Sequence, residues 1–439
     1  MISKGGRAYA LLKIMLELFK VRNFMSFREE SYLDMRATIL KQHPKHIIET
    51  KESFSDAKNG LLKTVAIYGA NASGKSNLIS ALYSMRMFIL SQIYDNSHTD
   101  NDPFRLEPFS LCSKNETTEF EIVFRYKGSR YQYGFEIMIP DSDDEKATQR
   151  IVSEWYYIDE NKVFERNHND VKFGTQYESA LKDYKKIPSE RIYISVLDYF
   201  LDDSKKGIVS DLITYLRKHF YVFSIPMIDF PVKRMGAFSS ISRRLIEDEK
   251  YRERVVSYLR QIDVGINDLV VIDDNDLNPE NGDIEEHKVV KSVHAMFTAE
   301  GNLDGSTEFG LFKESSGTLR FLAYIQRIIE IQESGGIFIV DELSDKLHPL
   351  LTKFIIDIFQ SEENQSAQLV FSTHDVFQLT KEQFRRDEVV FVDKNEKGES
   401  TTFSLAQLKV REDSTFNKDY ISGKYGAIPI FRTALEDEE

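Results

Sequence analysis

Short runs of apolar residues alternate with helical patterns over the first and last thirds of the chain. Four of these runs are typical of strands buried on both faces: 64–68, 337–340, 368–371 and 389–392. Apolar side chains recur at helical spacing in three segments: 77–90, 317–333 and 349–359. Strands that alternate with helices in this way predict an α/β fold with a largely parallel central sheet.

A second group of segments indicates an antiparallel β-subdomain. It comprises residues 16–27, 120–124, 131–139 and 151–158. Lys127-Gly128 lies between two of these segments and predicts a hairpin turn.

The stretch 160–300 is predicted to be a mostly helical insertion. Helical patterns at 208–220 and 243–262 support this, whereas 269–272 resembles a strand and 273–286 an acidic loop. The insertion also holds four basic residues, which indicate a solvated face more readily than a contact with nucleic acid or an acidic partner: Lys233, Arg234, Arg243 and Arg244.

The expected organisation is four parts: an extension 1–14, an N-terminal lobe 15–159, the insertion 160–300 and a C-terminal lobe 301–439.

The stretch between the first buried strand and its helix has the pattern of a phosphate-binding loop, GANASGKS. Gly69 and Gly74 let the backbone curl closely around a phosphate, and the helix N-terminus directs N–H groups at the anion. Lys75 can reach the β- and γ-phosphates, while the Ser76 hydroxyl can take a position on Mg²⁺. The predicted nucleotide-binding set in this stretch is Gly69, Asn71, Ala72, Ser73, Gly74, Lys75, Ser76 and Asn77.

Two further stretches place polar residues at the ends of buried strands. The run 337–340 ends in Asp341, a candidate Mg²⁺ ligand with Ser76, and in Glu342, a candidate base for the attacking water. The run 368–371 leads to His374, which could sense the γ-phosphate. Taken alone, the acids could simply be solvated and the histidine structural; one strand–helix–strand unit separates the two stretches, which favours the catalytic interpretation.

Small polar residues at the start of the 317–333 helix form a third candidate. Ser315, Ser316 and Gly317 could bind an anion at the helix N-terminus, or could be an ordinary helix cap. Lys75 already provides a positive charge for phosphates at the loop 69–76. An anion site at the start of this helix would therefore be the second half of a composite pocket.

In this order, these stretches resemble the head of ABC-type ATPases. Ser315–Thr318 looks like the signature sequence of that family, and Asp345, within SDKLH, occupies the place of its D-loop. NFMSF, GANASGKSNL, DELSDKLHP and YISGKYGAIP are similar to the SMC, recombination-nuclease and OLD group, above all to stand-alone ATPases of phage-defence and abortive-infection loci. The resemblance covers about 15–140 and 300–439.

The resemblance implies a P-loop NTPase of ABC-ATPase type that binds ATP and Mg²⁺ between two copies arranged head to tail. Glu342 and His374 would act in catalysis, and Ser76 and Asp341 would bind the metal. Ser315, Ser316 and Gly317 would come from the other copy, and Asp345 would contribute to nucleotide binding.

Composition narrows the choice of partners. The net charge of −14 argues against a general nucleic-acid coat, and the single cysteine, Cys112, suits a reducing cytoplasm. No apolar run is long enough to span a membrane, so we expect a cytoplasmic protein without membrane association.

The preferred hypothesis is a defence ATPase that forms a homodimer or larger homo-oligomer. It would sense a phage protein or DNA and control a separately encoded effector, most readily a nuclease. The alternatives are a DNA repair or chromosome-handling ATPase that binds DNA directly, and a nucleotide-dependent scaffold that does not hydrolyse ATP.

Overall fold

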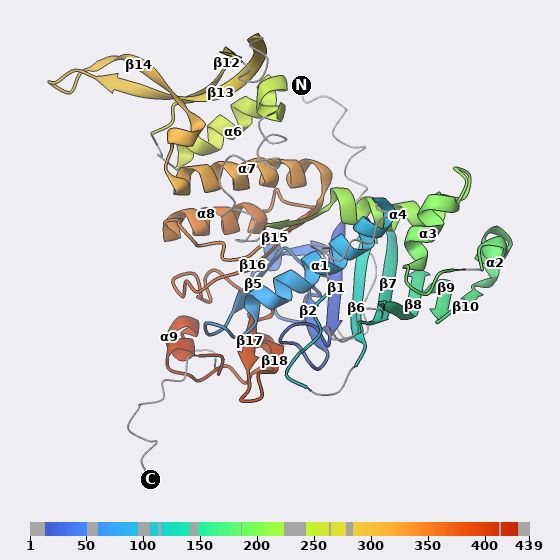
Figure 1. The fold of residues 1–439 in the computed structure, drawn as a ribbon. Helices are drawn as coiled ribbons and strands as arrows, with labels where there is room; N and C mark the ends of the chain where they lie inside the picture. The colour runs from blue at the N-terminus through green and yellow to red at the C-terminus, as the bar shows by residue number, and fades with distance from the viewer. Residues whose placement is uncertain are drawn as a thin grey trace. The chain divides into compact units, whose positions relative to one another are not determined.

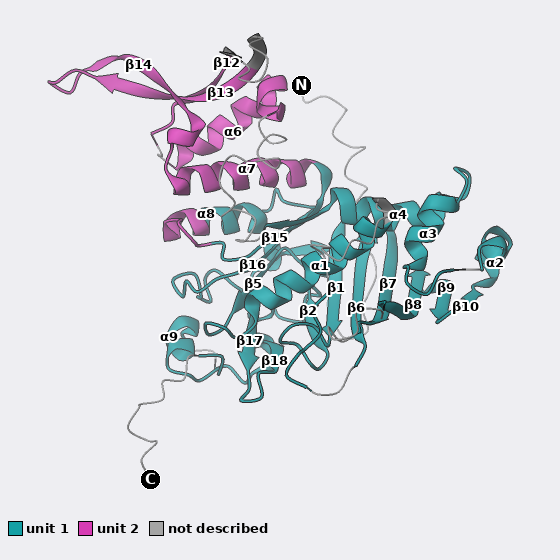
Figure 2. Ribbon diagram, in the orientation of Figure 1, with its two compact units in different colours: residues 1–224, 334–343, 353–439 teal, residues 225–333, 344–352 magenta. Residues whose placement is uncertain are grey.

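The computed structural model describes most of the chain, and it divides into two compact units, each treated by itself (Figure 2). The described residues are 14–50, 60–94, 106–112, 116–140, 148–185, 187–223, 243–262, 265–277, 284–411 and 414–428. Unit 1 comprises residues 1–224, 334–343 and 353–439, and unit 2 comprises 225–333 and 344–352. Residues 1–13 of the expected extension 1–14 lie outside the described residues.

Unit 1 contains a six-stranded mixed sheet in the order β11-β15-β16-β5-β17-β18 (Figure 1). The first five strands are parallel and β18 pairs antiparallel to β17. Every residue of β5, β15 and β16 is buried, which explains why most of their positions are apolar. The strands span Thr64–Tyr68 (β5), Phe220–Phe223 (β11), Gly336–Val340 (β15), Ala367–Ser372 (β16), Val389–Lys394 (β17) and Ser400–Ser404 (β18).

A seven-stranded antiparallel sheet in unit 1 has the order β10-β9-β8-β7-β6-β1-β2. Its strands span Met15–Arg22 (β1), Ser31–Asp34 (β2), Thr118–Tyr126 (β6), Ser129–Met138 (β7), Arg150–Ile158 (β8), Asn161–Asn167 (β9) and Asp170–Phe173 (β10). A two-stranded ladder pairs Ile47–Glu49 (β3) with Gly60–Leu62 (β4). The predicted hairpin turn is present, with Lys127 and Gly128 both at positive φ.

One continuous apolar core joins the two large sheets of unit 1 through helix α1. Leu78, Leu82 and Met85 of α1 are fully buried, and Phe88 stacks on Phe135 of β7 with ring centroids 5.5 Å apart. This packing fixes the helix that follows the phosphate loop. The helices of unit 1 are Lys75–Tyr94 (α1), Thr175–Leu181 (α2), Tyr193–Phe200 (α3), Gly207–Lys218 (α4) and Phe416–Ile421 (α9), with Pro349–Gln360 (α8) crossing the division between units.

The described part of unit 2 includes two long helices and a three-stranded antiparallel sheet in the order β12-β13-β14. Tyr251 of α6 donates a hydrogen bond to the carbonyl of Gln326 in α7 (3.2 Å), and Arg244 and Arg254 both pair with Glu333. The elements are Glu249–Gln261 (α6), Asp268–Leu277 (β12), Ile284–Phe297 (β13), Leu303–Gly310 (β14) and Ser316–Ser334 (α7).

The range 160–300 differs in detail from the expected mostly helical insertion. Its described part holds helices α2, α3, α4 and α6, but also strands β9 to β13. Strand β12 runs on to Leu277 through the acidic residues expected in a loop, because its backbone pairs with β13 along its whole length. Of the basic cluster, Lys233 and Arg234 lie outside the described residues, while Arg244 forms ion pairs with Glu333 and Asp248. The C-terminal lobe expected at 301–439 is divided between the two units.

Candidate nucleotide-binding site

The predicted phosphate loop connects the carboxyl end of β5 to the start of α1. Its turn needs positive φ at Ala72 (60°) and Gly74 (113°), and helix α1 begins directly at Lys75. A Cβ on Gly69 would lie 2.6 Å from the Ser73 hydroxyl and 2.3 Å from the Val392 carbonyl. The Ser73 Oγ is buried without a hydrogen-bond partner in the protein. A close backbone curl with an unsatisfied hydroxyl fits a loop that surrounds a phosphate.

Two serines from distant parts of the sequence, Ser26 and Ser400, support this loop and the start of α1 through hydrogen bonds. Ser400 Oγ donates to the Ser73 carbonyl (2.6 Å) and lies 2.8 Å from Ser26 Oγ. Asn77, predicted to contact nucleotide, donates its side-chain amide to Ser26 Oγ (2.7 Å). No role was predicted for Ser26 or Ser400; the NFMSF motif around Ser26 was the one signal in the sequence near this turn.

Replacing Gly74 with alanine is expected to destabilise the loop and abolish nucleotide binding. The new Cβ would lie 2.5 Å from Ser400 Oγ and 2.8 Å from Ser26 Oγ, in addition to the strain at φ +113°. Gly128→Ala is the matched control, because Gly128 also has positive φ (+89°) but has open space around it. Differential scanning fluorimetry should show the larger fall in melting temperature for Gly74→Ala, by several degrees, as for a loss of about 1–3 kcal/mol. Equal shifts would mean that the contacts with the serines do not constrain the loop.

The Lys75 side chain folds back over its own loop. Its ammonium donates to the carbonyls of Gly69 (3.0 Å) and Ala70 (2.9 Å), and the residue as a whole is 5% exposed. These carbonyl oxygens accept the hydrogen bonds that the phosphate oxygens of a nucleotide would accept from Lys75. Burial lowers the pKa of Lys75 to about 8, although the carboxylates of Glu342 and Asp341 act in the opposite direction.

The lowered pKa of Lys75 predicts that nucleotide affinity falls as the pH rises above 8. Bound phosphates favour the charged amine and so raise its pKa above the value in the free protein. Below pH 8 the free amine is already protonated; above it, binding must take up a proton, and affinity drops by up to about tenfold per pH unit. Calorimetric titrations at pH 7 to 9.5, in buffers of different ionisation enthalpy, measure both affinity and proton uptake. An affinity that stays constant to pH 9.5 would contradict the assignment of Lys75 to the phosphates.

Ser76 and Asp341 are brought together as predicted for a metal site. Ser76 Oγ donates to Asp341 Oδ1 (3.2 Å), and Asp341 directly follows β15 and is 5% exposed. The Asp341 carboxylate also accepts a hydrogen bond from Ser372 Oγ (2.6 Å). A serine hydroxyl and a carboxylate beside a phosphate loop are the oxygen donors that Mg²⁺ prefers, so this chemistry fits the ion.

Glu342 and His374 lie side by side at the same edge of the sheet. His374 Nε2 is 3.8 Å from Glu342 Oε1, and both side chains are about two-fifths exposed. Burial and the Lys75 ammonium lower the pKa of His374, although the Asp341 carboxylate acts in the opposite direction, so the neutral imidazole is favoured at pH 7. A half-exposed carboxylate next to a neutral imidazole can accept a proton from water.

The remaining predicted residues belong to unit 2. Ser315 caps α7: its hydroxyl accepts a hydrogen bond from the Thr318 N–H (3.1 Å), and Ser316 is exposed. Gly317 lies against the next loop, since a Cβ would be 2.7 Å from the Lys346 carbonyl. Asp345 of that loop forms an ion pair with the buried Arg320 (2.9 Å).

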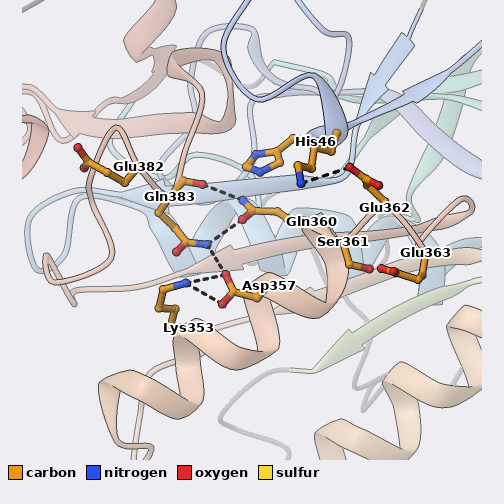
Figure 3. Close-up of a pocket in the computed structure, with 10 residues that line it drawn as sticks. His46, Lys353, Asp357, Gln360, Ser361, Glu362, Glu363, Glu382 and Gln383 are labelled. Carbon is orange, nitrogen blue, oxygen red and sulfur yellow. Dashed lines mark hydrogen bonds and ion pairs between the residues drawn. The ribbon is translucent and has the colours of Figure 1, made fainter.

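A separate pocket of about 400 Å³ lies at the amino ends of the parallel strands, the opposite edge of the sheet from the phosphate loop (Figure 3). Gln360 donates to Thr64 Oγ1 at the start of β5 (3.0 Å), and Gln383 donates to Gln360 (2.7 Å) and Asp357 (2.9 Å). The pocket contains none of the predicted site residues.

The fold and the site define a P-loop NTPase. A family model described as "AAA domain, putative AbiEii toxin, Type IV TA system" matches residues 65–379. The chain belongs to this family, which confirms the relationship to abortive-infection ATPases predicted from the sequence. No curated protein matches the chain significantly.

Solved structures of SMC head domains resemble the chain over most of its length. One is the SMC head bound to the C-winged helix domain of ScpA (14% identity, TM-score 0.40, covering 89% of this chain and 97% of that chain). Another is the SMC head domain from Thermotoga maritima (15%, 0.39, 90% and 99%). A third, from Pyrococcus furiosus, carries an extended coiled coil and is bound to the C-terminal domain of ScpA (12%, 0.40, 94% and 99%). No helix in the described part of the chain is long and apolar enough to cross a membrane.

Proposed function

We propose that the chain hydrolyses ATP in a Mg²⁺-dependent reaction. The observation that carries this proposal is the gathering of Lys75, Ser76, Asp341, Glu342 and His374 in unit 1, at the carboxyl ends of adjacent parallel strands. In open α/β sheets, ligands bind at the carboxyl ends of the strands. A nucleotide-binding scaffold without hydrolysis would not need Glu342 beside His374.

Each of these residues has a separate role in the proposed phosphoryl transfer. The loop N–H groups and Lys75 hold the phosphates, and Ser76 with Asp341 holds the metal. When held by these residues, Mg²⁺ would supply positive charge that stabilises the transferring phosphoryl group. Glu342 orients the attacking water and accepts its proton, while neutral His374 donates a hydrogen bond to a γ-phosphate oxygen.

The proposed site is completed by a second copy of the chain. Ser315, Ser316 and Gly317 of that copy would contact the γ-phosphate with the N-terminus of α7, and its Asp345 would lie nearby. The exposure of Ser315 and Ser316 supports this role, because a residue that contacts a nucleotide on another copy must face outward.

In the cell, we place this ATPase in antiviral defence. Nucleotide-driven assembly would respond to a phage protein or DNA and control a separately encoded effector, most readily a nuclease. The abortive-infection description of the family supports a defence role.

Phosphate release from ATP by the purified chain tests the catalytic proposal. We expect steady release with Mg²⁺ and none with excess EDTA. Nucleotide binding without Mg²⁺-dependent release would support the scaffold alternative instead.

A further inference from the structure

Ser372 is a buried polar residue next to the proposed metal ligand. It ends β16, the strand between β15 and β5, and pairs in register with Ile67 of β5. On the other side, Val340 pairs with Phe371, so Asp341 is the residue opposite Ser372. Ser372 is fully buried, and no role was predicted for it from the sequence.

The Ser372 hydroxyl connects the proposed metal ligand to the proposed catalytic base. It donates to Asp341 Oδ1 (2.6 Å) and accepts a hydrogen bond from the Glu342 backbone N–H (2.8 Å). The first distance is typical of a hydroxyl that donates to a carboxylate, which is a strong charge-assisted bond. One hydroxyl therefore constrains both the carboxylate of Asp341 and the backbone of Glu342.

Glu342 needs such support because its backbone is strained. Its φ of 53° lies in the left-handed region, which non-glycine residues seldom adopt. Beyond the bond to the Ser372 hydroxyl, the next residue, Leu343, donates its N–H to the Ser372 carbonyl (3.1 Å). Ser372 thus holds the chain on both sides of Glu342, and Asp341 is anchored in turn by its N–H on the Phe223 carbonyl (2.9 Å).

We propose that Ser372 is a positioning residue that sets the Asp341 carboxylate for Mg²⁺ and the Glu342 side chain for water. This inference rests on the proposed ATPase function and adds a residue to its site. The hydrogen bond from the Ser372 hydroxyl to Asp341 Oδ1 restricts the rotation of the carboxylate and keeps it beside Ser76. The same hydroxyl keeps Glu342 in the left-handed turn that directs its side chain towards His374.

Ser372→Ala tests this role through its Mg²⁺ dependence. Loss of a residue that orients a metal ligand typically weakens metal affinity or activity by about 10–100-fold. We expect the Mg²⁺ concentration for half-maximal phosphate release to rise about tenfold, kcat to fall about tenfold, and the KM for ATP at saturating Mg²⁺ to change less than about threefold. Ser372→Thr retains the hydroxyl and should restore the wild-type values.

Ser195→Ala is the matched control, because Ser195 is also a buried serine and donates only to the Ile89 carbonyl (3.3 Å). A fall in melting temperature for Ser372→Ala with unchanged Mg²⁺ dependence and kcat would overturn the proposal and leave Ser372 a structural residue. If Ser372→Ala does not fold, Ser372→Cys, which has a weaker donor, should still raise the Mg²⁺ requirement; an unchanged requirement would overturn the proposal.

A second readout separates this inference from the ATPase proposal. The gain in affinity for a fluorescent ATP analogue on adding Mg²⁺ is measured without hydrolysis. If wild type shows the gain but releases no phosphate, the ATPase proposal fails; Ser372 is then supported if the alanine variant loses the gain and overturned if it keeps it.

Discussion

Glu342→Gln is expected to bind ATP normally but to hydrolyse it about 10²–10⁴-fold more slowly than wild type, the usual contribution of a general base. Glutamine has the same shape as glutamate but cannot accept a proton from water. The backbone bond from Glu342 to Ser372 does not involve the side chain, so the turn should survive the change. Phosphate release measures turnover, and a fluorescent nucleotide measures binding. Because ATP persists, light scattering should also show a larger molar mass for this variant than for wild type.

Glu362→Gln provides the matched control for the change from acid to amide. Glu362 is exposed and pairs with Lys45 at the pocket on the opposite edge of the sheet. It should retain wild-type turnover. Unchanged turnover in Glu342→Gln would remove Glu342 from the chemistry, and His374 would then be the next group to test.

The sequence predicted the parallel sheet well because its strands are buried on both faces. Every position of β5, β15 and β16 is buried and most are apolar, so the apolar runs mark the strands clearly. The polar residues that end these runs then had to meet at one edge of the sheet. This geometry brought Ser76 and Asp341 within hydrogen-bond distance although 265 residues separate them in the chain.

The parts that the sequence did not predict depend on long-range pairing. Ser26 and Ser400 meet beneath the phosphate loop across 374 residues, and a lone serine carries no periodic signal. Ser372 is the last residue of β16, and nothing in the predicted strand 368–371 indicates a role for the side chain that follows it. The sequence of the acidic half of β12 favours turns and so predicts a loop, whereas pairing with β13 decides its conformation.

A mixing experiment should reveal whether two copies share each site. Lys75→Ala removes the charge that holds the phosphates, and Ser316→Glu places a carboxylate where the γ-phosphate of the other copy would lie. Ser316 is exposed at the first position of α7, where an acidic side chain favours the helix, so the variant should fold. Each variant alone should lose nearly all ATPase activity.

Equimolar mixing of the two variants should restore activity to about one quarter of wild type, if dimers form at random and contain two equivalent sites. Half of the dimers would then be mixed, and each would have one site with an intact Lys75 from one copy and an intact Ser316 from the other. Phosphate release at fixed total protein, across a series of mixing ratios, should peak at equal amounts. A mixture that stays inactive, with light scattering showing that dimers form, would mean that each copy builds its site alone. Full activity of Ser316→Glu by itself would remove the start of α7 from the site.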